Sequence, residues 1–200
     1  MYTWQQMTPR VRAEALSFRK CQDLPWHRPP HRESDRTTSY LFTAACYNHA
    51  PVIGRSAARM AEFEDVLITT IRHECQELFA WVVLPNHYHV VARTLDCFQT
   101  LKALGQMHGR TSCTWNGEDD RRGRTVWYKV AETAMKSERH FWATVNYIHH
   151  NPVKHRYVKK WQEWPFSSAA NFIEENGKAE AERLWREYPV DRYGDGWDEM

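Results

Sequence analysis

The feature that most limits the possible folds is an apolar run, Trp81–Arg93, which contains two histidines one residue apart, His87 and His89. Residues two apart on a β-strand point to the same face, so a strand here would aim both imidazoles at one point. Isolated pairs of this kind are common, and most bind nothing. Two adjacent imidazoles repel each other when protonated, however, and a metal ion is a good reason to place them together. The run therefore predicts a strand that carries two metal ligands.

A second segment, Asn146–Lys154, has the character of a helix that ends at Pro152. Residues four apart share a helix face, so Tyr147 should lie one turn from Asn151. Tyr147 alone would be interpreted as an ordinary buried aromatic residue, because apolar residues surround it on the helix. Combined with the histidine strand, the two segments supply two imidazoles, one amide oxygen and one phenol. This set suits metal-assisted attack of a tyrosine on a phosphodiester.

The expected ligands favour a particular kind of metal ion. Two neutral imidazoles and the Asn151 carbonyl oxygen leave coordination positions for water and phosphate oxygens, which suits Mg²⁺ or Mn²⁺. A zinc site made only of protein ligands would need another His or a Cys. A tyrosine hydroxyl ionises at about pH 10, so Tyr147 needs activation by a metal, a base or a positive field to attack near neutrality. The nearby cations that would supply this field are Lys136, Arg139, Lys154 and Arg156.

The net charge of +2 conceals an uneven distribution of charged residues. Residues 121–160 carry ten Lys or Arg against two acidic residues, whereas residues 161–200 carry ten acidic residues against four basic ones. A basic segment beside the expected site suits a polyanionic substrate, although a solvated basic helix face is the plain alternative. The acidic tail is interpreted as solubilising surface, with folding back onto the basic segment as the alternative.

Aromatic residues are interleaved with cations in the same part of the chain, which is typical of sequence-tolerant binding of single strands through stacking and phosphate contacts. Residues 111–124 are interpreted as a polar, basic loop around Trp115, which makes Trp115 the best candidate for stacking on a base. Trp127 is expected on a strand and in the core. The residues expected to contact DNA are Arg93, Trp115, Arg121, Arg122, Arg124, Lys136, Arg139, Lys154 and Arg156.

Hydrophobic periodicity predicts an α+β fold. Strands are expected at residues 40–47, 78–83, 87–93 and 126–130, and helices at residues 54–77, at 96–108 and from an N-cap at Ser137 to about Asn151. This order gives an antiparallel sheet with helices on one face, a ferredoxin-like layout. Three parts are expected: an N-terminal extension with a short helix at residues 1–36, a catalytic domain at 37–160 and the acidic C-terminal tail at 161–200.

Other features of the composition exclude some classes of protein. No apolar run approaches the length of a membrane span, and the first residues lack the charged-then-apolar pattern of a signal peptide. The five cysteines are odd in number and show no C-x-x-C spacing, so they are expected to be reduced thiols and not a disulfide framework or a zinc knuckle. The protein is therefore expected to be soluble and cytoplasmic, without a membrane partner.

Two motifs, in this order along the chain, resemble those of a known family. Leu84–Val91 (LPNHYHVV) is similar to the His-hydrophobe-His (HUH) signature, and Tyr147–Lys154 (YIHHNPVK) is similar to the catalytic helix of single-tyrosine transposases. Trp164–Ser168 (WPFSS) resembles the W-x-x-S-S element that follows that helix. Over roughly residues 38–170 the chain resembles in particular the REP-associated tyrosine transposases, which are relatives of small bacterial insertion-sequence transposases.

The resemblance implies a role for each matched position. His87, His89 and Asn151 would be the metal ligands, and Tyr147 would attack single-stranded DNA to form a 5′-phosphotyrosine and a free 3′-hydroxyl. The implied fold is ferredoxin-like. The implied substrates are repetitive extragenic palindromes, folded as hairpins with flanking single strand, in a bacterial cytoplasm. In a homodimer, Tyr147 would be able to serve the metal site of the partner.

Two other functions would use the same residues differently. A catalytically silent DNA- or RNA-binding module would keep its whole activity without Tyr147, although a decayed site is expected to have lost one of its members. A metal-dependent hydrolase, in which water attacks and Tyr147 is structural, would form no covalent adduct with DNA. The sequence ranks the tyrosine transposase first, the binding module second and the hydrolase third.

Overall fold

The computed structural model describes Thr8, Arg10 and residues 38–190, and the chain divides into two compact units, one of which is formed by residues 36–194. The short helix expected within residues 1–36 lies outside the described residues, as do residues 191–200. The fold below is that of residues 38–190. No helix among these residues is long and apolar enough to cross a membrane.

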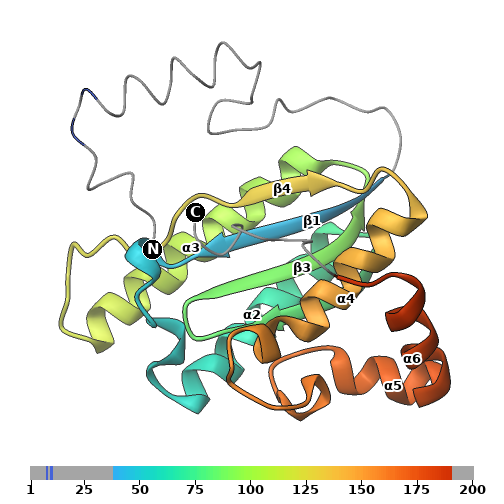
Figure 1. The fold of residues 1–200 in the computed structure, drawn as a ribbon. Helices are drawn as coiled ribbons and strands as arrows, with labels where there is room; N and C mark the ends of the chain where they lie inside the picture. Colours follow the sequence, from blue (N-terminus) through green and yellow to red (C-terminus); the bar gives the residue numbers. More distant parts are fainter. Residues whose placement is uncertain (1–7, 9, 11–37, 191–200) are drawn as a thin grey trace. The chain divides into compact units, whose positions relative to one another are not determined.

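Four strands form one sheet in the order β2-β3-β1-β4, and each neighbouring pair is antiparallel (Figure 1). The strands are β1 (Thr38–Ala45), β2 (Glu77–Val83), β3 (His87–Thr94) and β4 (Ala131–Ala134). A helix joins β1 to β2, a tight turn joins β2 to β3, and a second helix joins β3 to β4. This connectivity and strand order confirm the ferredoxin-like α+β prediction.

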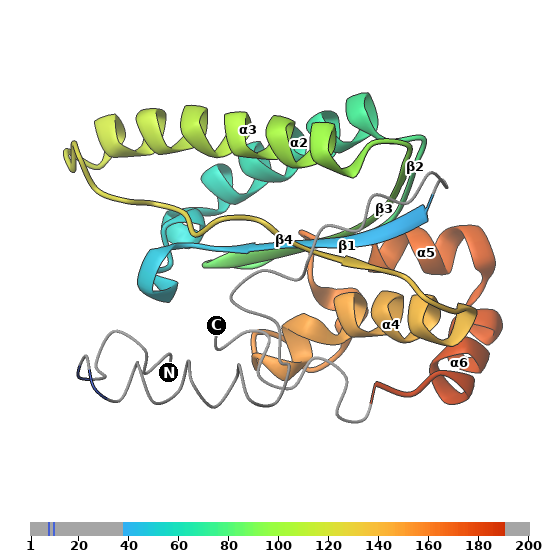
Figure 2. The ribbon, with the colours of Figure 1, turned by 90° about the horizontal axis from the view of Figure 1, so that it is seen from above.

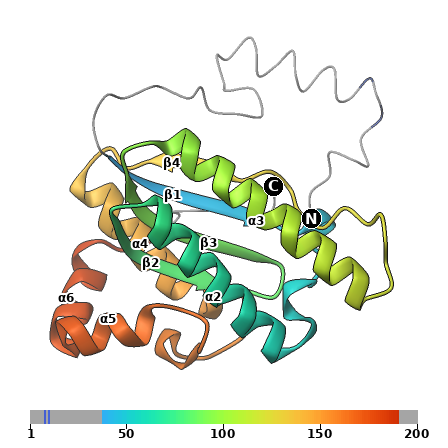
Figure 3. The same ribbon diagram turned by 180° about the vertical axis from the view of Figure 1, so that it is seen from behind.

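Two helices, α2 (Ala57–Glu74) and α3 (Cys97–Glu118), cover one face of the sheet (Figures 2 and 3). Each begins where a polar side chain accepts a hydrogen bond from a backbone N–H of the first turn, Ser56 in α2 and Asp96 in α3. Their apolar stripes pack on alternate residues of the central strands. This core includes Phe42, Ala44, Tyr88 and Val90 from the sheet, Phe63 and Leu67 from α2, and Leu104 and Met107 from α3.

The opposite face of the sheet is covered by α4 (Glu138–Lys154), with α5 (Ala169–Asn176) and α6 (Lys178–Glu187) beside it (Figure 2). The prediction that the helices lie on one face is therefore right for α2 and α3 and wrong for α4. The physical reason lies in the central strand β3, where every residue from His87 to Ala92 is buried. A strand without exposed positions on either side needs cover on both faces.

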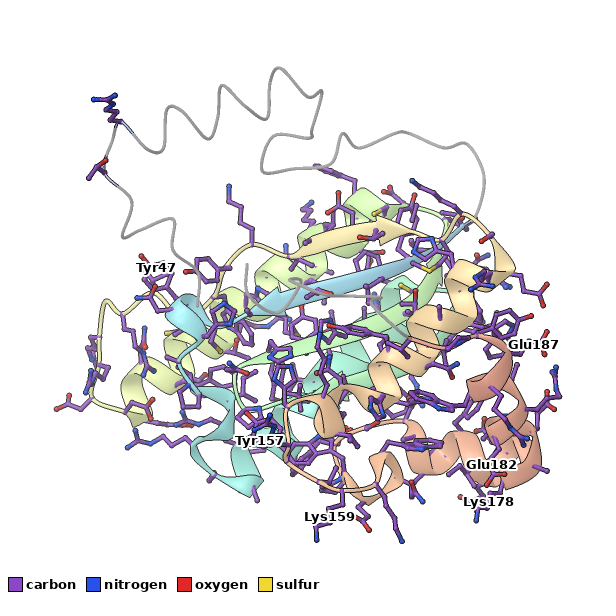
Figure 4. The ribbon with its side chains drawn as sticks, viewed as in Figure 1. Tyr47, Tyr157, Lys159, Lys178, Glu182 and Glu187 are labelled. Atoms are coloured by element: carbon purple, nitrogen blue, oxygen red, sulfur yellow. The ribbon has the colours of Figure 1, made fainter. Side chains whose placement is uncertain are left out.

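The described part of the segment expected to be an acidic tail is a folded layer against α4. It comprises a short 3-10 helix (Trp161–Glu163) followed by α5 and α6, and the side-chain amide of Asn146 in α4 donates to the carbonyl oxygens of Leu184 (3.1 Å) and Tyr188 (2.8 Å). The charged side chains of α6 lie on its outer side, including the labelled Lys178, Glu182 and Glu187 (Figure 4). The acidic residues of α6 therefore lie on the outer surface of a helix that packs against α4.

Several element boundaries differ from the predictions. Residues 111–118 are not a loop, because α3 continues to Glu118 and Trp115 continues its buried stripe seven residues after His108. The strand expected at residues 126–130 makes only an isolated bridge, Cys46 to Trp127, and the edge strand β4 follows it. Ser137 caps α4 as predicted, but the helix runs past Pro152 to Lys154. Two further 3-10 turns, Tyr47–His49 and Ile53–Arg55, connect β1 to α2.

Candidate active site

The two histidines of β3 lie side by side on the face of the sheet that α4 covers. Their ring centroids are 5.1 Å apart, and both side chains are buried. Thr43 of β1 pairs with His89 across the sheet and Ala45 pairs with His87, so the site begins at the two central strands. The alternation of β3 thus sends Tyr88 and Val90 into the core under α2 and α3, and sends the imidazoles to the other face.

Helix α4 brings the other two predicted site residues to these histidines. The ring of Tyr147 lies 5.2 Å from that of His89, between centroids, in an edge-to-face arrangement. One turn later, Asn151 places its Oδ1 atom 3.3 Å from Nε2 of His87. Tyr147 and Asn151 are both buried. The structure therefore gathers His87, His89, Tyr147 and Asn151 into one cluster between β3 and α4.

The proton on His87 can be assigned from its neighbour Asn86. The Asn86 amide nitrogen donates to the backbone oxygen of His49 (3.2 Å), which orients the amide and turns Oδ1 toward Nδ1 of His87, 2.7 Å away. Since Oδ1 can only accept, Nδ1 of His87 carries the proton. In the neutral ring, Nε2 of His87 then keeps its lone pair, as a metal ligand must.

Two acceptor atoms consequently face each other at the centre of the site. Nε2 of His87 and Oδ1 of Asn151 both present lone pairs across 3.3 Å, while the amide nitrogen of Asn151 is buried without a hydrogen-bond partner among the described residues. Facing lone pairs repel unless a cation lies near both. The donor set therefore fits a metal ion. Within the described residues no group of three or more His, Cys, Asp or Glu could hold a metal, so the amide oxygen of Asn151 is the candidate third ligand.

His89 is oriented by the neighbouring strand. The hydroxyl of Thr43 lies 2.8 Å from Nδ1 of His89, so this hydrogen bond engages one ring nitrogen and directs the other away from it. Hydrogen bonds of this kind set the orientation and the tautomer of a ligating histidine. Sequence reasoning missed both Asn86 and Thr43. The signal for Asn86 was its place next to His87, whereas the role of Thr43 depends on strand register.

Two residues at the end of α4 complete the surroundings. The ammonium of Lys154 lies 5.1 Å from the centre of the Tyr147 ring, which places one of the predicted cations beside the phenol. The ring of His155 lies 5.0 Å from that of His87. His155 was not among the predicted site residues, although Tyr147, Asn151 and His155 recur at intervals of four, the spacing of one helix face.

Three cations that were predicted to contact DNA, two of which were also expected to supply the positive field, lie away from the Tyr147 phenol. Lys136 and Arg139 flank the N-terminal end of α4, which is roughly 12 Å from Tyr147 at 1.5 Å per residue. Arg93 lies at the far end of β3 from His87 and forms an ion pair of 2.9 Å with Glu77. The structure therefore does not bring these three cations to the phenol.

The region around Trp115 also differs from its prediction as a stacking surface. Trp115 is 4% exposed and packs against Phe63 (5.5 Å) and Trp127 (5.6 Å), so its ring is part of the core and offers no face to a base. Arg124 donates to Asp119 (2.8 Å) and to Asn116 (2.9 Å) and ties together the end of α3. Arg121 and Arg122 are exposed on the turn between the end of α3 and Arg124.

The histidines that follow Tyr147 point away from the site, as the helical spacing predicts. His149 is buried on the other side of α4, where Nε2 lies 3.0 Å from the hydroxyl of Ser168 and the ring stacks on Trp161. His150 packs against Trp185. Burial lowers the pKa of His149 to about 3, so this side chain is neutral. Ser168 also accepts from the backbone N–H of Trp81, which attaches the W-x-x-S-S element to the edge strand β2.

Comparison with known proteins gives two related results. No family model matches this chain. A REP-associated tyrosine transposase of Escherichia coli (strain K12) is 30% identical over 138 residues, in an alignment that covers 61% of this chain and 66% of the relative, just under two thirds of its length. A solved structure described as a REP-associated tyrosine transposase bound to a REP hairpin has a TM-score of 0.55 and 22% identity, over 84% of this chain and 92% of that one. This second likeness supports the fold.

Proposed function

We propose that the chain is a REP-associated tyrosine transposase, which cuts and rejoins single-stranded DNA beside a palindromic hairpin with Tyr147 as the nucleophile; its similarity to the Escherichia coli relative supports this. The observation that carries the proposal is the contact of the Tyr147 ring with His89, in the same cluster as the facing His87 Nε2 and Asn151 Oδ1 atoms. A structural tyrosine in a core would not require an orphaned amide and two oriented imidazoles beside it.

His87, His89 and Asn151 are the residues that would hold the metal ion, and the donor set favours Mg²⁺ or Mn²⁺. The ion would supply Lewis-acid polarisation of the scissile phosphate. Asn86 and Thr43 hold the two imidazoles in place through their Nδ1 atoms. The chain's own contribution is thus a set of oriented ligands that need little rearrangement.

The proposed reaction is a transesterification at phosphorus. The phenol oxygen of Tyr147 forms a bond to the phosphorus atom, the bond from phosphorus to the 3′-oxygen breaks, and the phenol proton is balanced by a proton taken up by the leaving 3′-oxygen. The products are a 5′-phosphotyrosine and a 3′-hydroxyl, and attack by a 3′-hydroxyl reverses the step. The ammonium of Lys154 lies 5.1 Å from the centre of the Tyr147 ring, where its charge would offset negative charge that develops during the attack.

The reacting groups are proposed to act within one chain. Tyr147 already lies 5.2 Å from His89 of the same chain, between ring centroids, so no partner subunit is needed to assemble the cluster. The proposed substrate is hairpin DNA with a flanking single strand, because the relative with this fold is described as bound to a REP hairpin. Exposed Lys154 and Arg156 at the end of α4 would contact the phosphates.

The test is a search for a covalent protein–DNA adduct. Purified protein is incubated with Mn²⁺ and an end-labelled single-stranded palindrome from the DNA that flanks its gene, and the products are separated on a denaturing gel. We expect an adduct that is absent in Tyr147→Phe and absent when the metal is chelated. DNA that is bound but not cut would contradict the proposal and favour a DNA-binding module without catalytic activity. Cleavage without an adduct, preserved in Tyr147→Phe, would replace it by a hydrolase.

A further inference from the structure

The end of α4 adopts an unusual turn for its sequence. The backbone N–H of Tyr157 donates to Pro152 (2.9 Å) and that of Arg156 donates to Val153 (2.9 Å), the two bonds of a Schellman motif. The residue in the left-handed position of this motif is usually glycine, but here it is Arg156, with φ 61°. A positive φ disfavours arginine, so the surrounding contacts of the turn hold Arg156 in this conformation.

The turn presents the third member of a row of aromatic rings that starts at the proposed metal-ligand cluster. The rings of His87 and His155 are 5.0 Å apart, those of His155 and Tyr157 are 6.2 Å apart, and those of Tyr157 and Trp164 are 5.3 Å apart, all between centroids. The indole of Trp164 is held by donation to the backbone oxygen of Val83 (2.9 Å). His87 is therefore one ring removed from Tyr157.

Tyr157 is the part of this row that a ligand can reach. It is 44% exposed, whereas His87 is 3% exposed. It lies on the same loop after α4 as Lys159, and both are visible from the side of the sheet that α4 covers (Figure 4). An exposed aromatic ring with a fixed indole at its side is a stacking surface for a flat, apolar group.

The charge around Tyr157 selects the kind of ligand. Arg156 and Lys159 are exposed, as is Lys160, and the chain contains no acidic residue between Asn151 and Gln162. The next acidic residue, Glu163, accepts from the backbone N–H of Lys160 (3.3 Å), so cations still outnumber carboxylates around the ring. A ring among cations matches an unpaired base that is followed by its phosphates. A peptide or a lipid tail would gain little from three cations at this spacing.

We infer that Tyr157 is the stacking platform for an unpaired base adjoining the phosphodiester that Tyr147 attacks, and that Arg156 contacts the phosphate of that nucleotide. This inference rests on the proposed function and adds a subsite to it. Tyr157 takes the role that was expected of Trp115. Because Tyr157 lies one ring from His87, the bound base would help to set which phosphodiester reaches the catalytic cluster.

The first experiment measures binding without cleavage. Protein carrying Tyr147→Phe is titrated into a fluorescent hairpin with a single-stranded flank. We expect Tyr157→Ala to weaken binding on the order of 5- to 150-fold, the effect of one lost aromatic–base stack, and Tyr157→Phe to restore it. Phe98→Ala is the matched control, because Phe98 is also an exposed aromatic residue (74%) but lies on α3, away from the cluster.

A second series changes the DNA and the turn. An abasic nucleotide is placed at successive positions of the single-stranded flank. At one position it should weaken binding to the protein that keeps Tyr157, and at that position it should not weaken binding further when Tyr157 is replaced by alanine. Arg156→Gly should keep or raise the melting temperature, because glycine suits the left-handed turn, while reducing the salt dependence of binding by about one phosphate contact.

The outcomes separate this inference from the proposed function. Equal binding by Tyr157→Ala and its parent would overturn the platform even if the Tyr147 adduct forms. An unchanged salt slope in Arg156→Gly would overturn the phosphate contact. If the abasic nucleotide weakens binding only when Tyr157 is present, and no covalent adduct forms, the base-binding subsite would be supported and the proposed transesterase activity would be rejected. Melting curves of each variant exclude loss of folding as the cause.

Discussion

At the scale of single residues, the site depends on neighbours that orient the ligands. His87 and His89 each use Nδ1 in a hydrogen bond, to Asn86 and to Thr43 respectively. These contacts decide which nitrogen faces the cluster. Losing a partner of this kind commonly lowers metal affinity or activity by about 10- to 100-fold. Thr43 offers the cleaner test, since Asn86 also holds the backbone of His49.

Replacing Thr43 by valine should weaken metal binding. Valine has nearly the shape of threonine but no hydroxyl, so the Nδ1 atom of His89 loses its partner while the packing of β1 is preserved. We expect Mn²⁺ affinity to fall roughly 10- to 100-fold. Titration of Mn²⁺ followed by electron paramagnetic resonance measures it. Thr43→Ser keeps the hydroxyl and should bind Mn²⁺ nearly as the wild type does; equal affinity in Thr43→Val would show that His89 needs no such partner.

At the scale of elements, an ion cluster joins the beginning of α2 to the end of α3. Arg59 of α2 is 7% exposed and donates to both oxygens of Asp119, which is itself 1% exposed, and to Glu118. Arg124 and Arg55 also contact Asp119. The hydrogen bonds from Arg59 hold the pKa of the Asp119 carboxyl well below its usual range. The ion cluster thereby fixes the beginning of α2 against the end of α3.

Removing the Asp119 carboxylate should destabilise the protein strongly. Asp119→Ala removes the better-buried of the two carboxylates that pair with Arg59 and leaves Glu118 as the remaining one, so we expect a loss of about 3 kcal/mol of unfolding free energy, the low end for breaking a buried ion pair. Because the pKa of Asp119 is depressed in the folded state, its contribution to stability is fully present above the ordinary value of 3.8 and is lost progressively as the pH falls from there through the folded-state pKa. Urea unfolding at pH 7 and at pH 3 measures both effects. The difference between wild type and Asp119→Asn should shrink at pH 3; a constant difference would contradict this assignment.

At the scale of the whole described unit, β3 separates two layers that each enclose a neutral histidine. His108 is a buried residue of α3 that stacks on Trp127 at 4.2 Å between centroids and contacts the hydroxyl of Tyr88, and His149 of α4 lies on the other side of the sheet beside Ser168. Burial lowers the pKa of each to about 3. Protonating either side chain would place an unpaired positive charge in the interior.

The stability of the whole unit should therefore fall in mild acid. The two histidines take up protons near pH 6.5 in the unfolded chain but only near pH 3 in the folded one, so unfolding is favoured progressively as the pH drops below 6.5. Urea midpoints at intervals from pH 7.5 to pH 4.5 measure the slope. The double variant His108→Gln/His149→Gln should have a flatter profile over this interval. An unchanged slope would assign the acid sensitivity to other groups.

Much of the candidate site follows from local geometry. The period of two along β3 predicted that His87 and His89 share a face, and the spacing of four along α4 predicted that Tyr147 and Asn151 do so. The order of strands and helices was enough to indicate the ferredoxin-like sheet. These predictions needed no knowledge of distant contacts, because strand pleating and helical turns repeat the same geometry wherever they occur.

The tertiary structure decided what depends on residues far apart in the chain. Trp115 looked like a loop residue because its sequence neighbours are polar, yet it is core because Phe63 and Trp127 reach it from other elements. The register of β1 on β3 places Thr43 at His89, and the cover on both faces of β3 turns α4 toward the imidazoles. Periodicity determines which residues share a face, whereas the free energy of packing determines what each face meets, and that energy is summed over partners that no local pattern contains.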